Sequence, residues 1–296
     1  MNLKSRFPLF MMLLLVGSAT LIAQTAPRIV DAHLHYNGDP AFAEKVVEKL
    51  EPMNGLALLL TQPKDIGSAK AAIAKHPNRL MGMGEFELDD PAAVQLVDRF
   101  HEAGFRGLGE LELPLKNYDD RSYYPIYERA EKYGMILLIH TGIVNRTHPE
   151  IPTEISVDRM RVTTIDAIAR RFPKVTIIGA HMGNPDYSWA AEIARWNPNV
   201  YFDVSGSSLQ KKESDPTFWK TIFWWTGAGG PHTPAGGANA FERLVFGSDV
   251  FDGELEEFDR EVGRYHKMLD ANGVPKTAQE NIFAGTLWRI LNAQGH

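Results

Sequence analysis

The chain has 296 residues, a formal net charge of −6 and no cysteine. An acidic chain without a basic run is a poor candidate for binding nucleic acid, and the missing cysteine excludes disulfides, thiolate chemistry and lipid attachment at a signal-peptide cysteine. The length suits one large domain rather than two.

Residues 1–25 have the pattern of an export signal. Lys4 and Arg6 give a positive start, residues 9–16 form a short apolar core, and small residues typical of a cleavage site follow. The apolar run is too short and interrupted for a membrane span, although an uncleaved N-terminal anchor is the alternative. Removing this segment takes the formal charge from −6 to −8. We expect the mature protein, residues 26–296, to be periplasmic or secreted and to keep no stable membrane span.

Short apolar runs alternate with helical patterns along the mature chain. The apolar runs predict a first strand ending at His33 and further strands at 55–60, 80–85, 107–111, 135–139, 175–180, 200–204 and 244–246. Helical patterns cover 40–50, 68–75, 91–101, 123–133, 254–269 and 277–291. Eight such strands predict a parallel sheet closed into a (β/α)8 TIM barrel, as a single domain over 26–296. A doubly wound open sheet is the alternative, but no glycine-rich phosphate loop follows the first strand.

Ionisable side chains stand at or just beyond the ends of several predicted strands. They are His33 and His35 on the first strand, Glu110 on the fourth, His140 after the fifth, His181 after the sixth and Asp249 after the eighth. Buried ionisable groups are costly unless they are paired or bound to a metal. Alternate side chains of a strand share a face, so His33 and His35 can reach one metal ion together. The carboxyl ends of barrel strands also share one face, so all six side chains can converge there.

Several short motifs occur in a fixed order along the chain. They are VDAHLH at 30–35, YPIYE at 124–128 leading to LIHTG at 138–142, FPK at 172–174 leading to GAHMG at 179–183, and VFGSD at 245–249. Together they are specific, although no single one is. Through them the chain resembles the amidohydrolase-related family (amidohydrolase family 2) of the metal-dependent amidohydrolase superfamily, from residue 30 to about residue 291.

The resemblance implies an enzyme with a catalytic divalent metal, commonly zinc, on His33, His35, His140 and Asp249. His181 matches a histidine that acts as acid or base or binds a second metal. Ligands without a thiolate suit zinc, manganese or iron, so the identity of the metal stays open. A metal lowers the pKa of a bound water. Asp249 would orient that water and accept its proton, while His181 polarises the scissile group or protonates the leaving atom.

Glu110 has two interpretations. Some branches of the superfamily place a bridging carboxylate at the end of the fourth strand, which would allow two metals with His140 and His181 on the second. Alternatively, Glu110 hydrogen-bonds a ligand histidine without touching the metal. Glu112 points the same way on an ideal strand and is a weaker candidate for that supporting role.

Two long connections, 141–171 and 205–243, would emerge on the catalytic face and set substrate choice. The first carries Arg146 and Arg159, which are candidates for clamping a substrate carboxylate through two hydrogen bonds. The second carries Trp224 within an aromatic cluster, which either lines a substrate pocket or buries the connection against the barrel.

These features favour an exported metal-dependent hydrolase that cleaves a C–N or C–O bond, in an amide, lactone or ester, of a small molecule. A metal-dependent decarboxylase acting on a small carboxylic acid is the main alternative, because the resembled family includes such lyases. The acidic charge disfavours a metal-dependent deoxyribonuclease. A solute-binding barrel without catalysis would not need His181 and Asp249 beside the metal ligands. The oligomeric state is left open, with a homo-oligomer as one option.

Overall fold

The computed structural model describes residues 26–144, 155–226 and 239–293, and the predicted export signal at 1–25 lies outside these ranges. A curled sheet of parallel strands forms its centre, with every strand beside its neighbour in sequence. The strands are β1 (Ile29–Tyr36), β2 (Gly55–Thr61), β3 (Leu80–Gly84), β4 (Gly107–Leu111), β5 (Ile136–Ile139), β6 (Ile177–Gly179) and β7 (Val200–Phe202).

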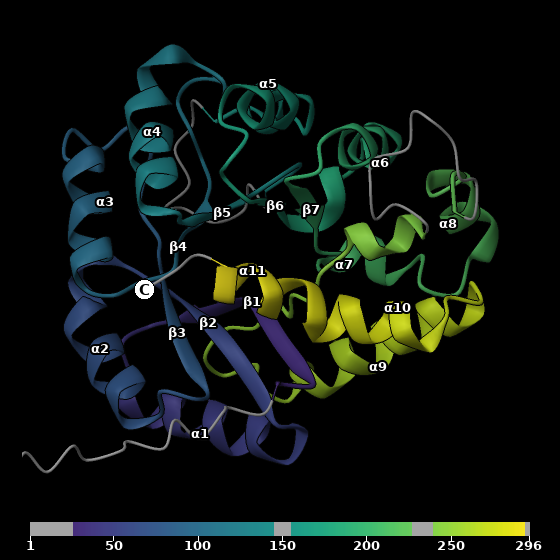
Figure 1. Cartoon of the computed structure of the whole chain (residues 1–296), viewed down its shortest axis with the longest axis horizontal. Coiled ribbons are helices and arrows are strands. Elements are labelled where there is room, and N and C mark those ends of the chain that lie inside the picture. The colour runs from purple at the N-terminus through teal and green to yellow at the C-terminus, as the bar shows by residue number, and fades with distance from the viewer. Residues whose placement is uncertain (1–25, 145–154, 227–238, 294–296) are drawn as a thin grey trace, which may run out of the picture.

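Helices follow the strands and lie around the outside of the sheet (Figure 1). They are α1 (Pro40–Leu50), α2 (Ile66–Lys75), α3 (Ala93–Glu102), α4 (Tyr124–Tyr133), α5 (Thr163–Arg171), α6 (Tyr187–Trp196), α7 (Ser207–Gln210), α8 (Pro216–Ile222), α9 (Glu257–Ala271), α10 (Lys276–Glu280) and α11 (Thr286–Ala293), with a π-helical turn at Asn281–Gly285. Local signals set their ends. Asp39 caps α1 by accepting from the Ala41 amide, and Gly134 ends α4 in the left-handed conformation.

The structure has no strand at the predicted position 244–246. Instead, the amide of Val245 donates to the carbonyl of Phe202 at 2.9 Å, and the carbonyl of Phe246 accepts from the Ala32 amide at 3.0 Å. Consecutive residues of this segment thus bond to β7 on one side and to β1 on the other, without the repeated ladder that defines a strand.

Alternate strand residues build an apolar cluster on one face of the sheet. Its strand members are Val30, Ala32, Leu56, Leu58, Leu60, Met83, Ile136, Leu138 and Ile178, and they are joined by Val245 and by Ala180, which directly follows β6. Ala284, Leu287 and Leu291 of the C-terminal helices pack into the same cluster. The guanidinium of Arg106, just before β4, donates to the carbonyl of Leu291. The C-terminal helices therefore cover the amino ends of the strands, in front of β1 in Figure 1, and the carboxyl ends remain for polar side chains.

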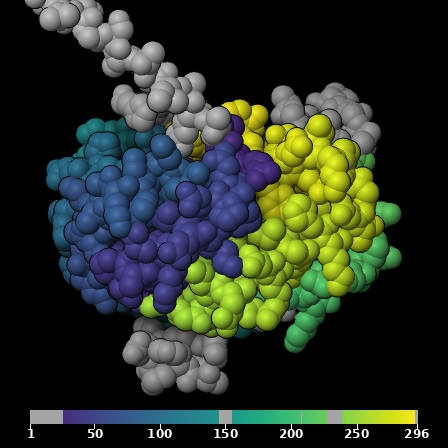
Figure 2. Space-filling model, turned by 90° about the horizontal axis from the view of Figure 1, so that it is seen from below, coloured from purple at the N-terminus to yellow at the C-terminus, as the bar shows by residue number. Residues whose placement is uncertain are grey.

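The beginning and the end of the described chain lie side by side. Figure 2 shows the purple and blue N-terminal part bordering the yellow-green C-terminal part. Lys49 of α1 and Asp259 of α9 form an ion pair across this border at 2.7 Å. Within the described ranges, the helices are too short or too polar to span a membrane.

Candidate metal centre

The six predicted ligands come together where the strands end. They form two groups, in each of which one nitrogen or oxygen atom per residue lies within 4.8 Å of the others. The first group is His33, His35, Glu110 and Asp249, and the second is Glu110, His140 and His181. Glu110 belongs to both.

In the first group, two imidazoles face the same pair of carboxylates. Nε2 of His33 lies 3.3 Å from Oε2 of Glu110 and 3.3 Å from Oδ1 of Asp249. Nε2 of His35 lies 3.8 Å and 3.5 Å from the same two oxygens. The two histidines of β1 thus reach one point, as the alternation of a strand predicts.

The second group gathers around the other oxygen of Glu110. Oε1 of Glu110 lies 2.9 Å from Nδ1 of His140 and 3.4 Å from Nε2 of His181. The rings of His140 and His181 are 4.8 Å apart. His140 therefore lies with His181 and not with the histidines of β1, and the two oxygens of one carboxylate face the two groups.

Local backbone irregularities aim several of these side chains. The register of β1 against β2 shifts between Asp31 and Leu34, around His33, and that of β4 against β5 shifts around Glu110. Such irregularities redirect side chains near functional sites. His181 and Asp249 both adopt the left-handed backbone conformation with φ of 58°. This conformation is uncommon for residues with a side chain and is found where the surroundings enforce it.

Three further residues hold the ligand imidazoles from behind, and the sequence reasoning missed them. Nδ1 of His33 lies 2.9 Å from Oδ2 of Asp203, and Nδ1 of His35 lies 3.5 Å from Oε2 of Glu85. The hydroxyl of Ser205 lies 3.0 Å from Nδ1 of His181. A signal was present in the sequence, because Asp203 directly follows the apolar β7 and Glu85 directly follows β3.

The carboxylates and imidazoles shift each other's ionisation strongly. Burial by itself lowers the pKa of His35 and His181, but the nearby carboxylates of Asp249 and Glu110 respectively raise each pKa to about 9. Burial acts in the opposite sense on Glu110, whose pKa is nevertheless held well below its usual range by His33 and by His140. The cluster is therefore rich in negative charge and stabilises positive charge placed among its ligands.

Glu112 has a different environment from Glu110. Burial, reinforced by the nearby Glu110 and Glu85 carboxylates, raises the pKa of Glu112 to about 8. Within the described ranges, Glu112 makes no hydrogen bond to the ligand histidines. The hydrogen bonds of the described residues therefore do not support the predicted role of Glu112 in holding a ligand histidine.

The arrangement fits a divalent metal. The Nε2 atoms of His33, His35 and His140 are buried and have no hydrogen-bond partner among the described residues. Buried nitrogen atoms without a partner are unfavourable, and those of His33 and His35 lie beside the carboxylate oxygens of Glu110 and Asp249, which can bind the same divalent ion. Nitrogen and oxygen ligands without sulfur suit zinc, manganese or iron.

A cavity of about 210 Å³ opens onto the centre. It is lined by His140, Ile143, His181, Asn184, Ser205, Gly206, Ser208, Leu209 and Asp249. Trp224 lies elsewhere: its indole nitrogen donates to Glu192 of α6 and its ring stacks under Arg195 at 4.6 Å. Arg159 is half-buried and does not line this cavity, and Arg146 lies outside the described residues. Substrate contacts by these three residues remain predictions.

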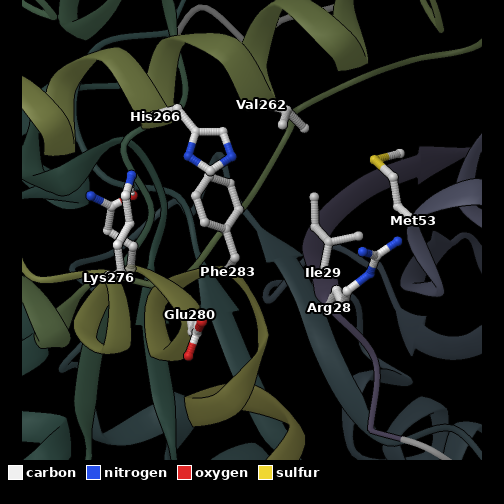
Figure 3. A pocket seen from close by; sticks show the side chains of 9 residues that line it. Arg28, Ile29, Met53, Val262, His266, Lys276, Glu280 and Phe283 are labelled. Carbon is white, nitrogen blue, oxygen red and sulfur yellow. Dashed lines mark hydrogen bonds between the residues drawn. The ribbon is translucent and has the colours of Figure 1, made fainter.

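A larger cavity of about 400 Å³ lies away from the metal ligands (Figure 3). Ile29, Val262 and Phe283 contribute apolar walls, and His266 lies against the ring of Phe283 with centroids 4.3 Å apart. Ile29 begins β1, whereas His35 lies near the end of that strand. This cavity therefore opens at the opposite end of the strand from the candidate centre and contains none of its ligands.

Comparison with known proteins places this chain in a family. The family model described as amidohydrolase matches residues 66–286, whereas none of the curated proteins matches the chain. Among solved structures, a TIM-barrel protein from Bordetella bronchiseptica is 15% identical, with 90% of this chain and 99% of that chain covered and a TM-score of 0.58.

Two further structures carry names of reactions. A probable 2-pyrone-4,6-dicarboxylic acid hydrolase from Acinetobacter baumannii is 13% identical, covering 89% of this chain and 99% of its own, with a TM-score of 0.58. The 5-carboxyvanillate decarboxylase from Sphingomonas paucimobilis is 14% identical, covering 90% and 99%, with a TM-score of 0.56. At these identities the likeness shows the α/β fold alone. The family match covers most of the chain, and the members of this family are enzymes: the chain belongs to the amidohydrolase family.

Proposed function

We propose that the protein is a metal-dependent hydrolase that cleaves a C–N or C–O bond, in an amide, lactone or ester, of a small molecule. The observation that carries this proposal is the position of Glu110, whose two oxygens face two separate groups of imidazoles. His33, His35 and Asp249 would hold one ion, His140 and His181 the other, and Glu110 both. A divalent ion, most simply zinc, supplies the Lewis acidity that makes water nucleophilic near neutral pH.

The residues of this chain then handle the proton and the substrate. Asp249 lines the cavity, and its side chain is 23% exposed, so one carboxylate oxygen is accessible to a water and can accept its proton. His181 lines the same cavity, with its Nδ1 3.9 Å from Oδ2 of Asp249. If only the first group holds an ion, this imidazole is not a ligand and can instead polarise a carbonyl or protonate a leaving atom. The small cavity supports a small-molecule substrate.

A decarboxylase is the second candidate. Structures with a similar fold include both a probable lactone-type hydrolase and decarboxylases of aromatic acids, so the fold supports either reaction. The shared carboxylate and the predicted export signal favour hydrolysis.

The experiment incubates the purified, zinc-supplemented protein with small lactones, esters and amides, and in parallel with aromatic and aliphatic carboxylic acids. We expect metal-dependent acid release from the first set, abolished by Asp249→Asn. Glu112→Gln serves as a matched carboxyl control, because Glu112 belongs to neither ligand group. Carbon dioxide release from the second set, without turnover of the first, would overturn the hydrolase proposal in favour of the decarboxylase.

The same proposal includes the architecture and the location. We infer that the segment 244–250 completes a (β/α)8 barrel, because it hydrogen-bonds to both β7 and β1, and that residues 26–296 form one domain. We also infer export to the periplasm or medium. N-terminal sequencing of the exported protein should find a start near residue 26, and an intact Met1 on that protein would contradict signal cleavage.

A further inference from the structure

Asp203 is a fully buried carboxylate with donors around both oxygens. Its Oδ2 lies 2.9 Å from Nδ1 of His33. Its Oδ1 accepts from the backbone amide of His181 at 2.9 Å, from the backbone amide of Ser205 at 3.1 Å and from the Ser205 hydroxyl at 2.7 Å. All three partners of Oδ1 donate, and an ionised carboxylate can only accept, so Nδ1 of His33 also donates to the ionised form of Asp203.

These directions determine which imidazole nitrogens carry hydrogen. Nδ1 of His33 must carry a hydrogen to donate to Asp203, which leaves Nε2 of a neutral His33 with a free lone pair. The Ser205 hydroxyl spends its only hydrogen on Asp203, so its oxygen accepts from Nδ1 of His181, 3.0 Å away. A neutral His181 that donates through Nδ1 has its lone pair on Nε2, available to a metal; without a metal, Nε2 also carries a hydrogen and donates to the facing Glu110.

We propose that Asp203 is a positioning residue that sets the imidazole tautomer in both ligand groups, His33 directly and His181 through the hydroxyl of Ser205. This inference rests on the proposed metal site for its purpose, because only a nitrogen lone pair can ligate a metal. The series of hydrogen bonds from His33 through Asp203 and Ser205 to His181 is present in the protein without metal. One carboxylate thereby prepares both halves of the centre.

Two glycines leave the space that this chain of contacts needs. A Cβ on Gly247 would lie 2.9 Å from Oδ2 of Asp203 and 3.0 Å from Cβ of His33. A Cβ on Gly206 would lie 3.0 Å from Nδ1 of His181. These distances are shorter than ordinary contacts of a Cβ. A larger residue at either glycine would therefore displace the side chains that make these hydrogen bonds.

Asp203→Asn should change the hydrogen bond to His33 and leave the hydrogen bonds on the Ser205 and His181 side intact. The asparagine oxygen should keep the side with three donors, because only an acceptor satisfies Ser205 and His181 there. Its amide group then faces Nδ1 of His33, which must become an acceptor and transfer its hydrogen to Nε2. Ser205→Ala should do the converse, because it removes the acceptor of His181 and leaves the contact between Asp203 and His33.

The matched control is Asp31→Asn. Asp31 is also fully buried and accepts from the backbone of His33 and from Ser248, but it touches no imidazole ring. It therefore reports the effect of removing a buried carboxyl group on β1 that contacts no imidazole ring. Cooperative thermal unfolding of each variant establishes that it is folded.

The measurement is the imidazole N–H correlation by ¹⁵N-edited NMR, first without metal and then with zinc. We expect protected Nδ1–H signals from His33 and His181 in the wild type. Asp203→Asn should lose the His33 signal alone, Ser205→Ala the His181 signal alone, and Asp31→Asn neither. Zinc affinity, measured by competition with a chelator, should fall about 10–100-fold at the affected group.

Unchanged imidazole signals in folded Asp203→Asn would overturn the inference, as would loss of the His33 signal in Asp31→Asn. The metal-free spectra separate this failure from failure of the proposed function. If the signals change as expected but no variant or wild type binds zinc, the hydrogen-bond chain stands and the metal proposal falls.

Discussion

Replacing Glu110 by glutamine tests whether one carboxylate serves two metal ions. Glutamine keeps the shape of the side chain but offers one acceptor oxygen instead of two and carries no charge. In the protein, Oε1 of Glu110 lies 2.9 Å from His140 and Oε2 lies 3.3 Å from His33. The substitution therefore removes a ligand atom from one group and a negative charge from both.

The two groups should respond unequally. After the change, the first group still has His33, His35 and the charged Asp249, whereas the second has only His140 and His181 as strong ligands. Two neutral imidazoles do not complete a zinc site, which normally needs three or four protein ligands. We expect two equivalents of zinc per chain in the wild type and one in Glu110→Gln. Affinity for the remaining ion should fall at least about 10-fold. Losing a residue that only hydrogen-bonds a ligand typically costs about 10–100-fold, and Glu110 is expected to contact the ion itself.

The assay is elemental analysis of metal per chain after zinc loading and removal of free metal. Glu112→Gln is the matched control, because it removes a nearby, partly buried carboxyl that belongs to neither group, and it should keep two equivalents. Two equivalents retained in Glu110→Gln would refute the bridging role. One equivalent in both wild type and variant would limit Glu110 to supporting a ligand and would favour the decarboxylase.

Three further outcomes follow from the same structure. Zinc at 100 times its dissociation constant should add about 2.7 kcal/mol to the free energy of unfolding. In calorimetry this should raise Tm by roughly 5–11 °C, and an unchanged Tm would argue against a metal site. Gly247→Ala brings a Cβ to 2.9 Å from the Asp203 carboxylate, so zinc affinity by chelator competition should fall about 10-fold, whereas wild-type affinity would contradict the tight packing. Glu261→Ala leaves the buried Arg264 guanidinium without its carboxylate partner. The free energy of unfolding, measured in urea, should fall by about 3–5 kcal/mol, and a loss under about 1 kcal/mol would refute a stabilising role for this ion pair.

Regular elements with a strong period could be predicted from the sequence. The helix at 40–50 and the strand at 107–111 have the predicted bounds, because a cap and an unbroken apolar run mark them locally. The predicted strand at 244–246 does not form, because this segment lacks a continuous run of strand partners. The segment makes only isolated bridges, Leu244 with Phe202 and Val250 with Leu34, and the Phe246 amide donates to the carbonyl of Ile282 instead of to a strand.

The connections were harder to predict than the sheet. Helix α5 lies inside the stretch 141–171 that the sequence analysis treated as a connection, and α6 follows β6 without having been predicted. Within α5, the buried Ile165 and Ile168 mark only a short apolar stripe among polar neighbours. Such a stripe becomes decisive only when the sheet is present to cover it, because packing rather than propensity stabilises most short helices.

The candidate ligands could be predicted because they follow apolar runs, and the grouping of His140 with His181 was one of the alternatives that the sequence left open. His140 and His181 follow β5 and β6, which are neighbours in the sheet, and this adjacency brings their rings to 4.8 Å. Asp203 follows an apolar run in the same way as the predicted ligands. It was missed because a carboxylate that contacts only imidazoles and a hydroxyl belongs to no ligand motif.

Four of the six candidate ligands lie where the backbone departs from regular strand geometry. His33 and Glu110 lie where the ladder changes register, and His181 and Asp249 have left-handed backbones. A regular strand end would point alternate side chains along one line, whereas two adjacent ions need ligands from several directions. The amide of Asp249 is fixed by the carbonyl of His33 at 2.7 Å, so the irregular ends support each other. The fold brings strand ends to one face, and these departures from the strand turn that face into a site.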